Sequence, residues 1–156
     1  IIIKNNQPYL LEYNCRFGDP ETQAILPLLD EDLIELLISC VEGKLGLRKL
    51  RWLDKKCVCV ILASKGYPET SSKDDLIEGL DKFENIKSFK DNILIFHAGT
   101  KNLNGKLYTN GGRILGVVSK ENTFKQARKN VYNAISGISF KGMQYRSDIA
   151  KKVEEK

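Results

Sequence analysis

The second half of the chain alternates short apolar runs with turn sequences and then ends in one amphipathic segment. Residues 57–63 are apolar on both faces, as in a central buried strand, and further strands are expected at 93–96, 107–110 and 113–118, with a shorter one around 76–80. Asn104-Gly105 predicts the turn of a hairpin. Thr123 predicts the N-cap of a long helix whose apolar face continues to Ile138. Strands followed by one helix that covers a sheet indicate an α+β fold.

The first 43 residues have a different pattern. Residues 1–3 and 9–14 are expected to be strands joined by a turn at 5–8, and 22–29 a short helix made irregular by Pro27. A firmer helix is predicted over 30–42, capped by Asp30, ended by Gly43 and packed through a wide apolar stripe. Because the sequence opens inside a hairpin and without Met, we expect it to be the C-terminal portion of a longer protein.

Between these two halves, residues 44–56 interleave Lys and Arg with Leu and Trp52, so we place a linker there. The pattern has two interpretations. It could be a basic and aromatic surface for RNA or another anionic partner. It could also be a solvated connector whose apolar residues pack on a neighbouring element, and the single tryptophan favours this second interpretation.

Composition narrows the functional class. The net charge is +5, but Lys and Arg are scattered among acids, which suits an anionic small molecule at least as well as a nucleic acid. No apolar stretch reaches the roughly 20 residues that a membrane span needs. The four cysteines do not form a disulfide framework or a zinc motif, which favours reduced thiols in a cytoplasmic protein.

The residues that point most clearly to chemistry lie in segment 9–23. Glu12 and Asn14 are two residues apart in a run with strand character, so both side chains should project to one face. A carboxylate and an amide oxygen together suit a hard cation such as Mg²⁺. Arg16, Gly18 and Asp19 follow directly, and a cation beside a tight polar loop indicates phosphoryl chemistry.

Three loops share a glycine next to a cation, at 16–19, 97–101 and 110–113. Glycine lets backbone amides approach an anion closely, while Lys101 and Arg113 would supply charge. If the loops converge, they would form a site for a phosphorylated substrate. His97 could act as a general base or could simply be bonded within its loop, and the sequence leaves both open. No Ser or Cys nucleophile signature is present.

Five segments together resemble the phosphoribosylamine–glycine ligase (glycinamide ribonucleotide synthetase) family of the ATP-grasp superfamily. They are LEYNCRFGDPETQ at 11–23, ASKGYP at 63–68, FHAGTK at 96–101, TNGGR at 109–113 and YRSDI at 145–149. The resemblance implies that 1–43 end an ATP-grasp domain, 44–56 are a linker, and 57–156 form a small, mainly antiparallel C-terminal domain covered by a helix.

The family's reaction joins glycine to 5-phosphoribosylamine at the expense of ATP, by way of glycyl phosphate, in cytoplasmic purine biosynthesis. By resemblance, Glu12 and Asn14 would hold Mg²⁺ or Mn²⁺, and Arg16 would face the charge that develops on the glycine carboxylate. Gly18 and Asp19 would shape the substrate loop. Lys101 and Arg113 are the expected ligands of the sugar phosphate, on the weaker ground of loop chemistry.

The sequence departs from the family pattern in two ways. Tyr13 and Cys15 replace other apolar residues, but should face away from the metal. The chain also lacks most of the ATP site, so we expect the partner to be the missing N-terminal part and the chain alone to be inactive. Neither a nucleic acid nor a membrane is an expected partner. The alternative is a stand-alone basic module that binds RNA or another anionic partner.

Overall fold

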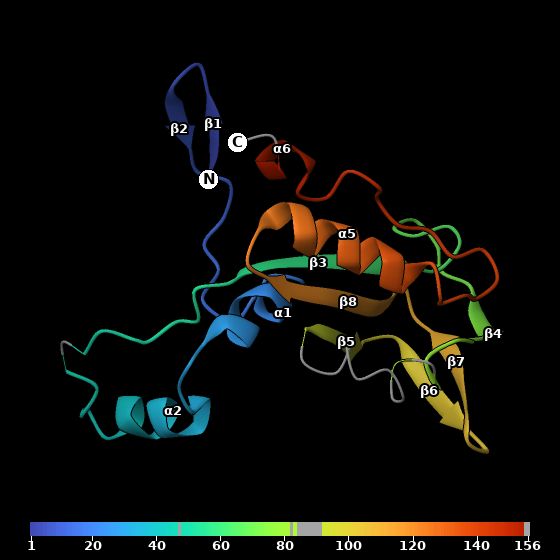
Figure 1. Ribbon diagram of the computed structural model, residues 1–156, viewed down its shortest axis with the longest axis horizontal. Helices are drawn as coiled ribbons and strands as arrows, with labels where there is room; N and C mark the ends of the chain where they lie inside the picture. Colours follow the sequence, from blue (N-terminus) through green and yellow to red (C-terminus); the bar gives the residue numbers. More distant parts are fainter. Residues whose placement is uncertain (47, 82, 84–91, 155–156) are drawn as a thin grey trace.

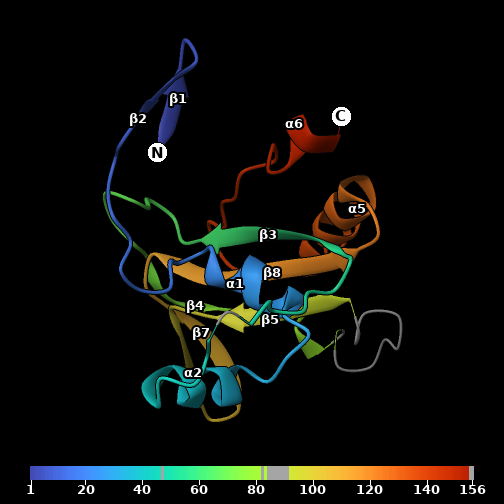
Figure 2. The same cartoon turned by 90° about the vertical axis from the view of Figure 1, so that its left-hand side faces the viewer.

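The computed structural model describes residues 1–46, 48–81, 83 and 92–154, and its centre is a three-stranded antiparallel sheet (Figure 1). The strand order is β3 (Lys56–Ala63), β8 (Arg113–Glu121) and β5 (Ile93–His97). Helix α5 (Phe124–Ile135) packs across β3 and β8, and the short helix α1 (Thr22–Ile25) contacts the same two strands (Figures 1 and 2). Antiparallel sheets with helices against them confirm the α+β prediction.

The middle of this sheet is β8. Every residue from Ile114 to Ser119 is buried, and β8 pairs with a strand on each side. Among the described strands, β3 pairs with β8 alone, apart from an isolated bridge between its last residue, Ala63, and Gln144. Val58, Val60 and Leu62 of β3 are buried, while Cys57, Cys59 and Ile61 are half-buried. Our placement of 57–63 as the central strand was therefore wrong. A run that is apolar on both faces shows that elements cover both faces, and an edge strand can meet that condition too.

The helix predicted after Thr123 is confirmed. Thr123 Oγ1 accepts a hydrogen bond from the Gln126 amide at 3.2 Å, as an N-cap does. The buried residues of α5 meet the sheet and form the core with it; they are Ala127, Val131, Ala134 and Ile135. This face holds the C-terminal half of the chain together.

A second antiparallel sheet contains β4 (Lys73–Leu76), β7 (Lys106–Asn110) and β6 (Thr100–Leu103), in that order. Asn104 and Gly105 join β6 to β7 with φ angles of 51° and 79°, so the predicted hairpin turn is confirmed. The strand expected around 76–80 is misplaced, because the pairing with β7 spans 73–76 instead.

The N-terminal hairpin is present but short. Strands β1 (Ile2–Lys4) and β2 (Gln7–Tyr9) pair across a turn in which Asn5 and Asn6 have φ of 51° and 61°. The predicted strand 9–14 is wrong in its bounds, because β2 ends at Tyr9 and residues 10–14 form an irregular segment. The helix at 22–29 is irregular as predicted: α1 gives way to a 3₁₀ turn, Leu26–Leu28, that contains Pro27.

Helix α2 (Leu33–Val41) differs from its prediction in its cap and in its packing. Its cap is Asp32 rather than Asp30, since Asp32 Oδ1 accepts from the amides of Ile34 and Glu35 at 2.8 and 3.2 Å. Leu36 is the only buried residue within α2, and Ile34 is 67% exposed. The apolar stripe therefore stays largely exposed within the described part of the chain, and α2 lies away from the main sheet (Figure 1).

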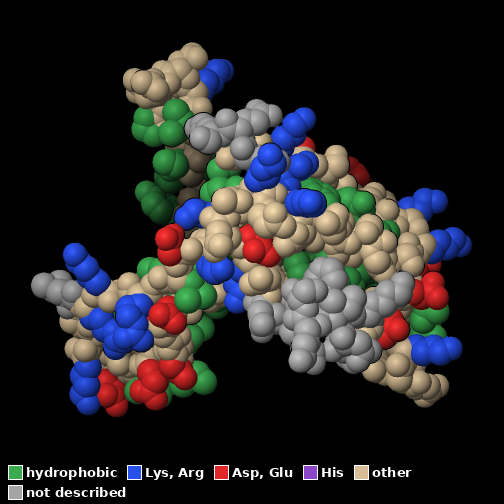
Figure 3. Space-filling model, viewed as in Figure 1, with side chains coloured by type: hydrophobic (Ala, Val, Ile, Leu, Met, Phe, Trp, Pro, Cys, Tyr) green, Lys and Arg blue, Asp and Glu red, His purple; other side chains and the backbone are tan. Residues whose placement is uncertain are grey.

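The remaining features concern the tail and the surface. A short helix, α6 (Lys151–Glu154), follows the 145–149 segment. Lys and Arg side chains are spread over the face shown in Figure 3 and interleave with Asp and Glu. No helix in the described part of the chain combines the length and apolar character needed to cross a membrane.

Candidate functional site

Glu12 and Asn14 lie in the irregular segment after β2, with both side chains exposed. Although no strand forms there, Asn14 Nδ2 donates to Glu12 Oε1 at 3.3 Å, so the two side chains still face each other. Rotating the amide by half a turn would direct its oxygen to the same place. The donor set of one carboxylate and one amide oxygen fits a hard divalent cation that keeps other ligands from water or phosphate. Within residues 1–46, 48–81, 83 and 92–154, no cluster of three His, Cys, Asp or Glu residues could hold a metal without outside ligands.

The loop that follows is tied to α1. The Gly18 carbonyl accepts hydrogen bonds from the Thr22 amide at 2.9 Å and from Thr22 Oγ1 at 2.6 Å. Gln23 Nε2 donates to Asp19 Oδ1 at 2.9 Å. Arg16 is exposed, and its Nη1 donates to the Phe17 carbonyl at 3.2 Å. The loop conformation is thus fixed locally, while the Arg16 side chain extends into solvent.

Arg113, at the start of β8, joins this loop to the main sheet. Its Nη1 donates to the Asp19 carbonyl at 2.9 Å, and its Nη2 lies 3.1 Å from Asp19 Oδ2. These two residues are 94 positions apart in the sequence. The structure therefore brings together two of the predicted site residues, one from each half of the chain.

The other two glycine loops touch each other directly. The Gly99 amide donates to the Arg113 carbonyl at 2.8 Å, and the Asn110 amide donates to the Gly99 carbonyl at 2.7 Å. A Cβ on Gly99 would lie 2.7 Å from the Arg113 carbonyl oxygen and 2.9 Å from Gly111 Cα. Only glycine fits this approach. Together with the bonds between Arg113 and Asp19, these contacts show that all three loops converge.

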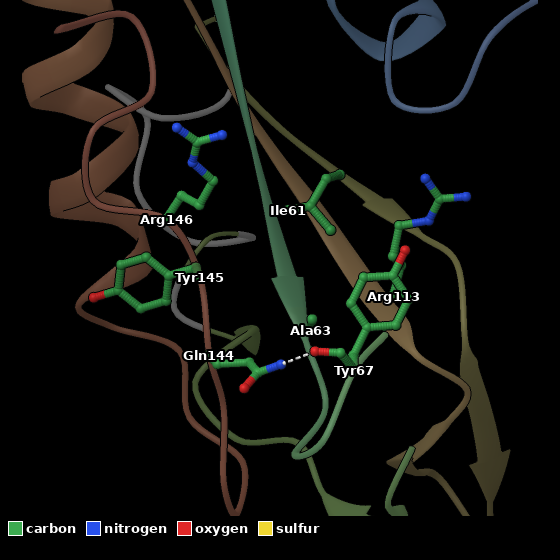
Figure 4. Close-up of a pocket in the computed structure, with 7 residues that line it drawn as sticks. All are labelled: Ile61, Ala63, Tyr67, Arg113, Gln144, Tyr145 and Arg146. Carbon is green, nitrogen blue, oxygen red and sulfur yellow. Dashed lines mark hydrogen bonds between the residues drawn. The ribbon is translucent and has the colours of Figure 1, made fainter. Parts of the chain in front are cut away.

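The Arg113–Asp19 pair contributes to two pockets. The first, of about 440 Å³, is lined by Ile61, Ala63, Tyr67, Arg113, Gln144, Tyr145 and Arg146 (Figure 4). The second, of about 510 Å³, is lined by the 17–19 loop, by residues of α1 and the 3₁₀ turn, and by Leu94, Phe96 and His97. Arg113 lines the first pocket and Asp19 lines the second, so the ion pair links a residue of each pocket.

Lys101 and His97 are placed differently from Arg113. Lys101 lies on β6, forms an ion pair with Asp74, and lines neither of these two pockets. His97 lines the second pocket, and its Nδ1 is 3.1 Å from Thr100 Oγ1. The convergence predicted from the sequence therefore includes the loop that carries Lys101, but not the Lys101 side chain itself.

Arg146 was not among the residues that the sequence suggested. Its Nε and Nη2 donate to the two carboxylate oxygens of Asp148 at 2.9 and 2.7 Å. This pairing holds the pKa of Asp148 below its usual value and that of Arg146 above it. The signal that could have found Arg146 is segment 145–149, which carries polar residues that no core position explains.

Helix α5 holds this segment in place. The Tyr132 hydroxyl donates to the Arg146 carbonyl at 2.7 Å and accepts from the Ile149 amide at 3.2 Å. Arg128 donates to the carbonyls of Ser147 and Ile149 and lies over the Tyr132 ring, 5.1 Å from its centroid. Burial raises the pKa of Tyr132, consistent with a hydroxyl that stays protonated and donates.

Comparisons with known proteins agree with one another. Residues 57–152 match the family described as phosphoribosylglycinamide synthetase, C domain. A phosphoribosylamine–glycine ligase of Caldanaerobacter subterraneus is 47% identical over 150 residues, which are 96% of this chain and 34% of that protein. A bifunctional purine biosynthetic protein of Dictyostelium discoideum is 49% identical over 92% of this chain and 17% of its own length. The crystal structure of phosphoribosylamine–glycine ligase from Thermotoga maritima superposes with a TM-score of 0.76 and 33% identity, covering 94% of this chain and 34% of that one. The chain thus spans about a third of the length of the ligases that it matches.

Proposed function

The chain belongs to the phosphoribosylglycinamide synthetase C-domain family, and on that basis we propose that it is the C-terminal part of an ATP-dependent ligase. The ligase would join glycine to 5-phosphoribosylamine in purine biosynthesis, in the cytoplasm. The observation that carries the proposal is the convergence of the three glycine loops through Asp19, Gly99 and Arg113. Relatives named as this ligase, aligned over 96% of the chain, support it.

The reaction would proceed in two steps. A carboxylate oxygen of glycine attacks the γ-phosphorus of ATP, and ADP leaves, which gives glycyl phosphate. The amine of phosphoribosylamine then attacks the acyl carbon, the bond to phosphate breaks, and the amine loses a proton. The products are glycinamide ribonucleotide, ADP and phosphate. Because charge develops on transferring oxygens in both steps, fixed cations would contribute most of the catalysis.

Glu12 and Asn14 would hold Mg²⁺ or Mn²⁺, which when bound neutralises charge on the ATP phosphates. Their facing side chains supply two oxygen ligands, and the ATP phosphates, water or the longer protein would supply the others. Arg16, exposed beside this pair, would face the charge on the glycine carboxylate as it is phosphorylated.

Gly18 and Asp19 would shape the substrate loop that α1 fixes, and Arg113 would bind the sugar phosphate from the opposite side. Lys101 remains in the proposal as a second substrate-binding residue. Its ion pair with Asp74 is the contact that substrate would have to replace. This makes Lys101 the less favourably placed of the two cations.

An exposed apolar surface supports the proposal that further protein covers the metal-binding side. Leu10, Leu11, Tyr13 and Phe17 are 56%, 68%, 81% and 59% exposed, and they flank Glu12 and Asn14. The stripe on α2 is exposed as well. Large contiguous apolar patches in a water-soluble protein mark interaction sites. The remaining two thirds of a full-length ligase would bury these residues and complete the ATP site.

The test is a chimaera in which this chain replaces the matching segment of the Caldanaerobacter ligase. We expect ADP release that depends on both glycine and phosphoribosylamine, and none from the chain alone. Glu12→Ala and Asn14→Ala should each reduce turnover severely in the chimaera while its thermal unfolding stays unchanged. A folded but inactive chimaera, or near-normal kinetics in both variants, would contradict the proposal. Turnover by the chain alone would contradict its need for a partner.

The alternative, a basic module for RNA, has lost its main support. Arg48 of the linker is ion-paired with Glu31, and Arg51 donates from its backbone and its guanidinium to Glu31 and to the Asp30 carbonyl. Trp52 forms a β-bridge with Leu29. These contacts give two of the linker's cations partners within the chain, while Trp52 stays 49% exposed. RNA binding that weakens with salt and survives Glu12→Ala would revive the alternative.

A further inference from the structure

We propose that the pocket between Arg113 and Arg146 binds the phosphate monoester of the sugar substrate, with Arg146 as its principal new ligand. The inference rests on the proposed function for the identity of that sugar. It goes beyond it by assigning Arg146, Tyr67 and Gln144 to the site, none of which was among the substrate-binding residues predicted from the sequence.

The charge of this pocket favours an anion. The guanidinium groups of Arg113 and Arg146 lie on opposite sides, with Ile61 between them (Figure 4). No carboxylate is among the described residues that line the pocket. Two guanidinium groups suit a phosphate monoester, because each can donate more than one hydrogen bond in a planar arrangement.

The neighbouring aspartates orient these arginines without occupying the pocket. The Asp148 carboxylate accepts hydrogen bonds from Nε and Nη2 of Arg146. Within the described part of the chain, Arg146 Nη1 has no partner. The Asp19 carbonyl accepts one hydrogen bond from Nη1 of Arg113, and the Asp19 carboxylate is ion-paired with Nη2. Since a guanidinium has five N–H donors, both arginines keep donors for a ligand.

The walls of the pocket suit a sugar rather than a bare anion. Tyr67 and Tyr145 supply ring surface, Ile61 and Ala63 supply aliphatic surface, and the pocket is about 440 Å³. Gln144 Nε2 donates to the Tyr67 carbonyl at 2.9 Å, which ties the 63–68 turn to the strand-like segment 143–146. The C–H faces of a ribose can lie against such walls while its phosphate reaches the arginines.

The competing sites are less suitable. The second pocket is lined by the Asp19 carboxylate and lacks a Lys or Arg among its lining residues that the structure describes. Lys101 is ion-paired with Asp74 and lies outside the first pocket. Charge, shape and the convergence of three of the five family-like segments therefore favour the first pocket.

Tyr132 and Arg128 are positioning residues for this site. The Tyr132 hydroxyl forms hydrogen bonds with backbone groups before and after Asp148. The Arg128 guanidinium donates two more to backbone carbonyls of the same segment. The segment that presents Arg146 is thereby fixed to α5. We expect Tyr132→Phe to increase amide hydrogen exchange in 146–149 and to weaken sugar-phosphate binding. A substitution of a residue that does not contact the 146–149 segment should change neither.

The test is calorimetric titration of the 156-residue chain with ribose 5-phosphate, and with ribose and inorganic phosphate as separate probes. We expect ribose 5-phosphate to bind more tightly than either. Arg146→Gln should weaken it by roughly 10- to 100-fold, because a charge-assisted hydrogen bond is lost. Arg146→Lys should give an intermediate affinity. The matched control is Lys125→Gln at the exposed start of α5, which removes the same charge and should change affinity by less than about twofold.

Each other result would overturn the proposal. The proposal is refuted if the native chain does not bind ribose 5-phosphate, or if it binds inorganic phosphate with equal affinity. It is also refuted if Arg146→Gln leaves the affinity unchanged, or if Lys125→Gln weakens it equally. The Arg146 side chain is 73% exposed, so its variants should fold, and thermal unfolding checks this. If the chimaera is active but Arg146→Gln leaves its KM for phosphoribosylamine unchanged, the assignment of this pocket is refuted and the proposed function is not. If the chimaera is inactive but ribose 5-phosphate still binds in a manner that depends on Arg146, the proposed function is refuted and the pocket assignment is not.

Discussion

Replacing Gly99 by alanine tests whether two of the glycine loops form one rigid unit. The added Cβ would lie 2.7 Å from the Arg113 carbonyl oxygen and 2.9 Å from Gly111 Cα, and both of these are backbone atoms. Backbone cannot rotate away as a side-chain tip can, so the contact between the loops must open. We expect the free energy of unfolding to fall by about 1–3 kcal/mol, the usual cost of adding a methyl group where there is no room.

Gly116 provides the matched control because it also lies within this antiparallel structure. A Cβ there would meet Ile61 Cδ1 at 3.4 Å and two other side-chain atoms at 3.8 Å, which are ordinary contacts. Gly116→Ala should therefore be neutral or stabilise the fold by up to about 1 kcal/mol, through the lower entropy of the unfolded chain.

Urea denaturation followed by circular dichroism would measure both variants. Because Arg113 lies at the contact, Gly99→Ala should also weaken ribose 5-phosphate binding. Equal stability of the two variants would refute the reasoning, since it would mean that the loops do not approach as closely as the structure shows.

The other four predictions concern two hydrogen-bonded side chains, Tyr132 and Asp32, and two half-buried thiols, Cys57 and Cys59. Tyr132→Phe removes a hydroxyl with two hydrogen bonds and should cost about 1–2 kcal/mol in urea denaturation; no change would show that water replaces it without cost. Asp32→Ala removes the cap of α2 and should speed hydrogen exchange of that helix several-fold, for a loss of about 1 kcal/mol, without affecting the core. Burial raises the pKa of Cys57 to about 11 and of Cys59 to about 12, so iodoacetamide at pH 8 should modify the exposed Cys15 and Cys40 before these two. Since the unfolded thiols ionise first, at their ordinary pKa of 9.0, the free energy of unfolding should fall as pH rises from there through about 11; a flat profile in calorimetry would contradict this.

Local sequence determined the elements whose signals are short-range. Asn104-Gly105 determined a hairpin because its residues adopt positive φ easily, and Thr123 determined the start of α5 because its hydroxyl can accept from an amide three residues on. Chemical type alone also singled out Glu12, Asn14 and the glycine loops as candidate site residues. Their individual roles remain predictions.

Where the sequence failed, the missing information was the identity of the neighbouring element. The strand expected at 9–14 ends at Tyr9, since residues 10–14 have no strand partner within the described chain. Residues 57–63 looked central, but β8 takes that place because it has a partner on each side. The stripe on α2 predicted burial, yet no partner covers it within the described chain.

The candidate site divides in the same way. The sequence determined which side chains could bind a cation or a phosphate, since that is a matter of charge and donor atoms. Only the tertiary structure decided that Asp19 meets Arg113 across 94 residues, that Lys101 pairs with Asp74 instead, and that Arg146 faces the same pocket as Arg113. Contacts between distant segments depend on strand order and on packing over the whole sheet, which no local pattern of residues contains.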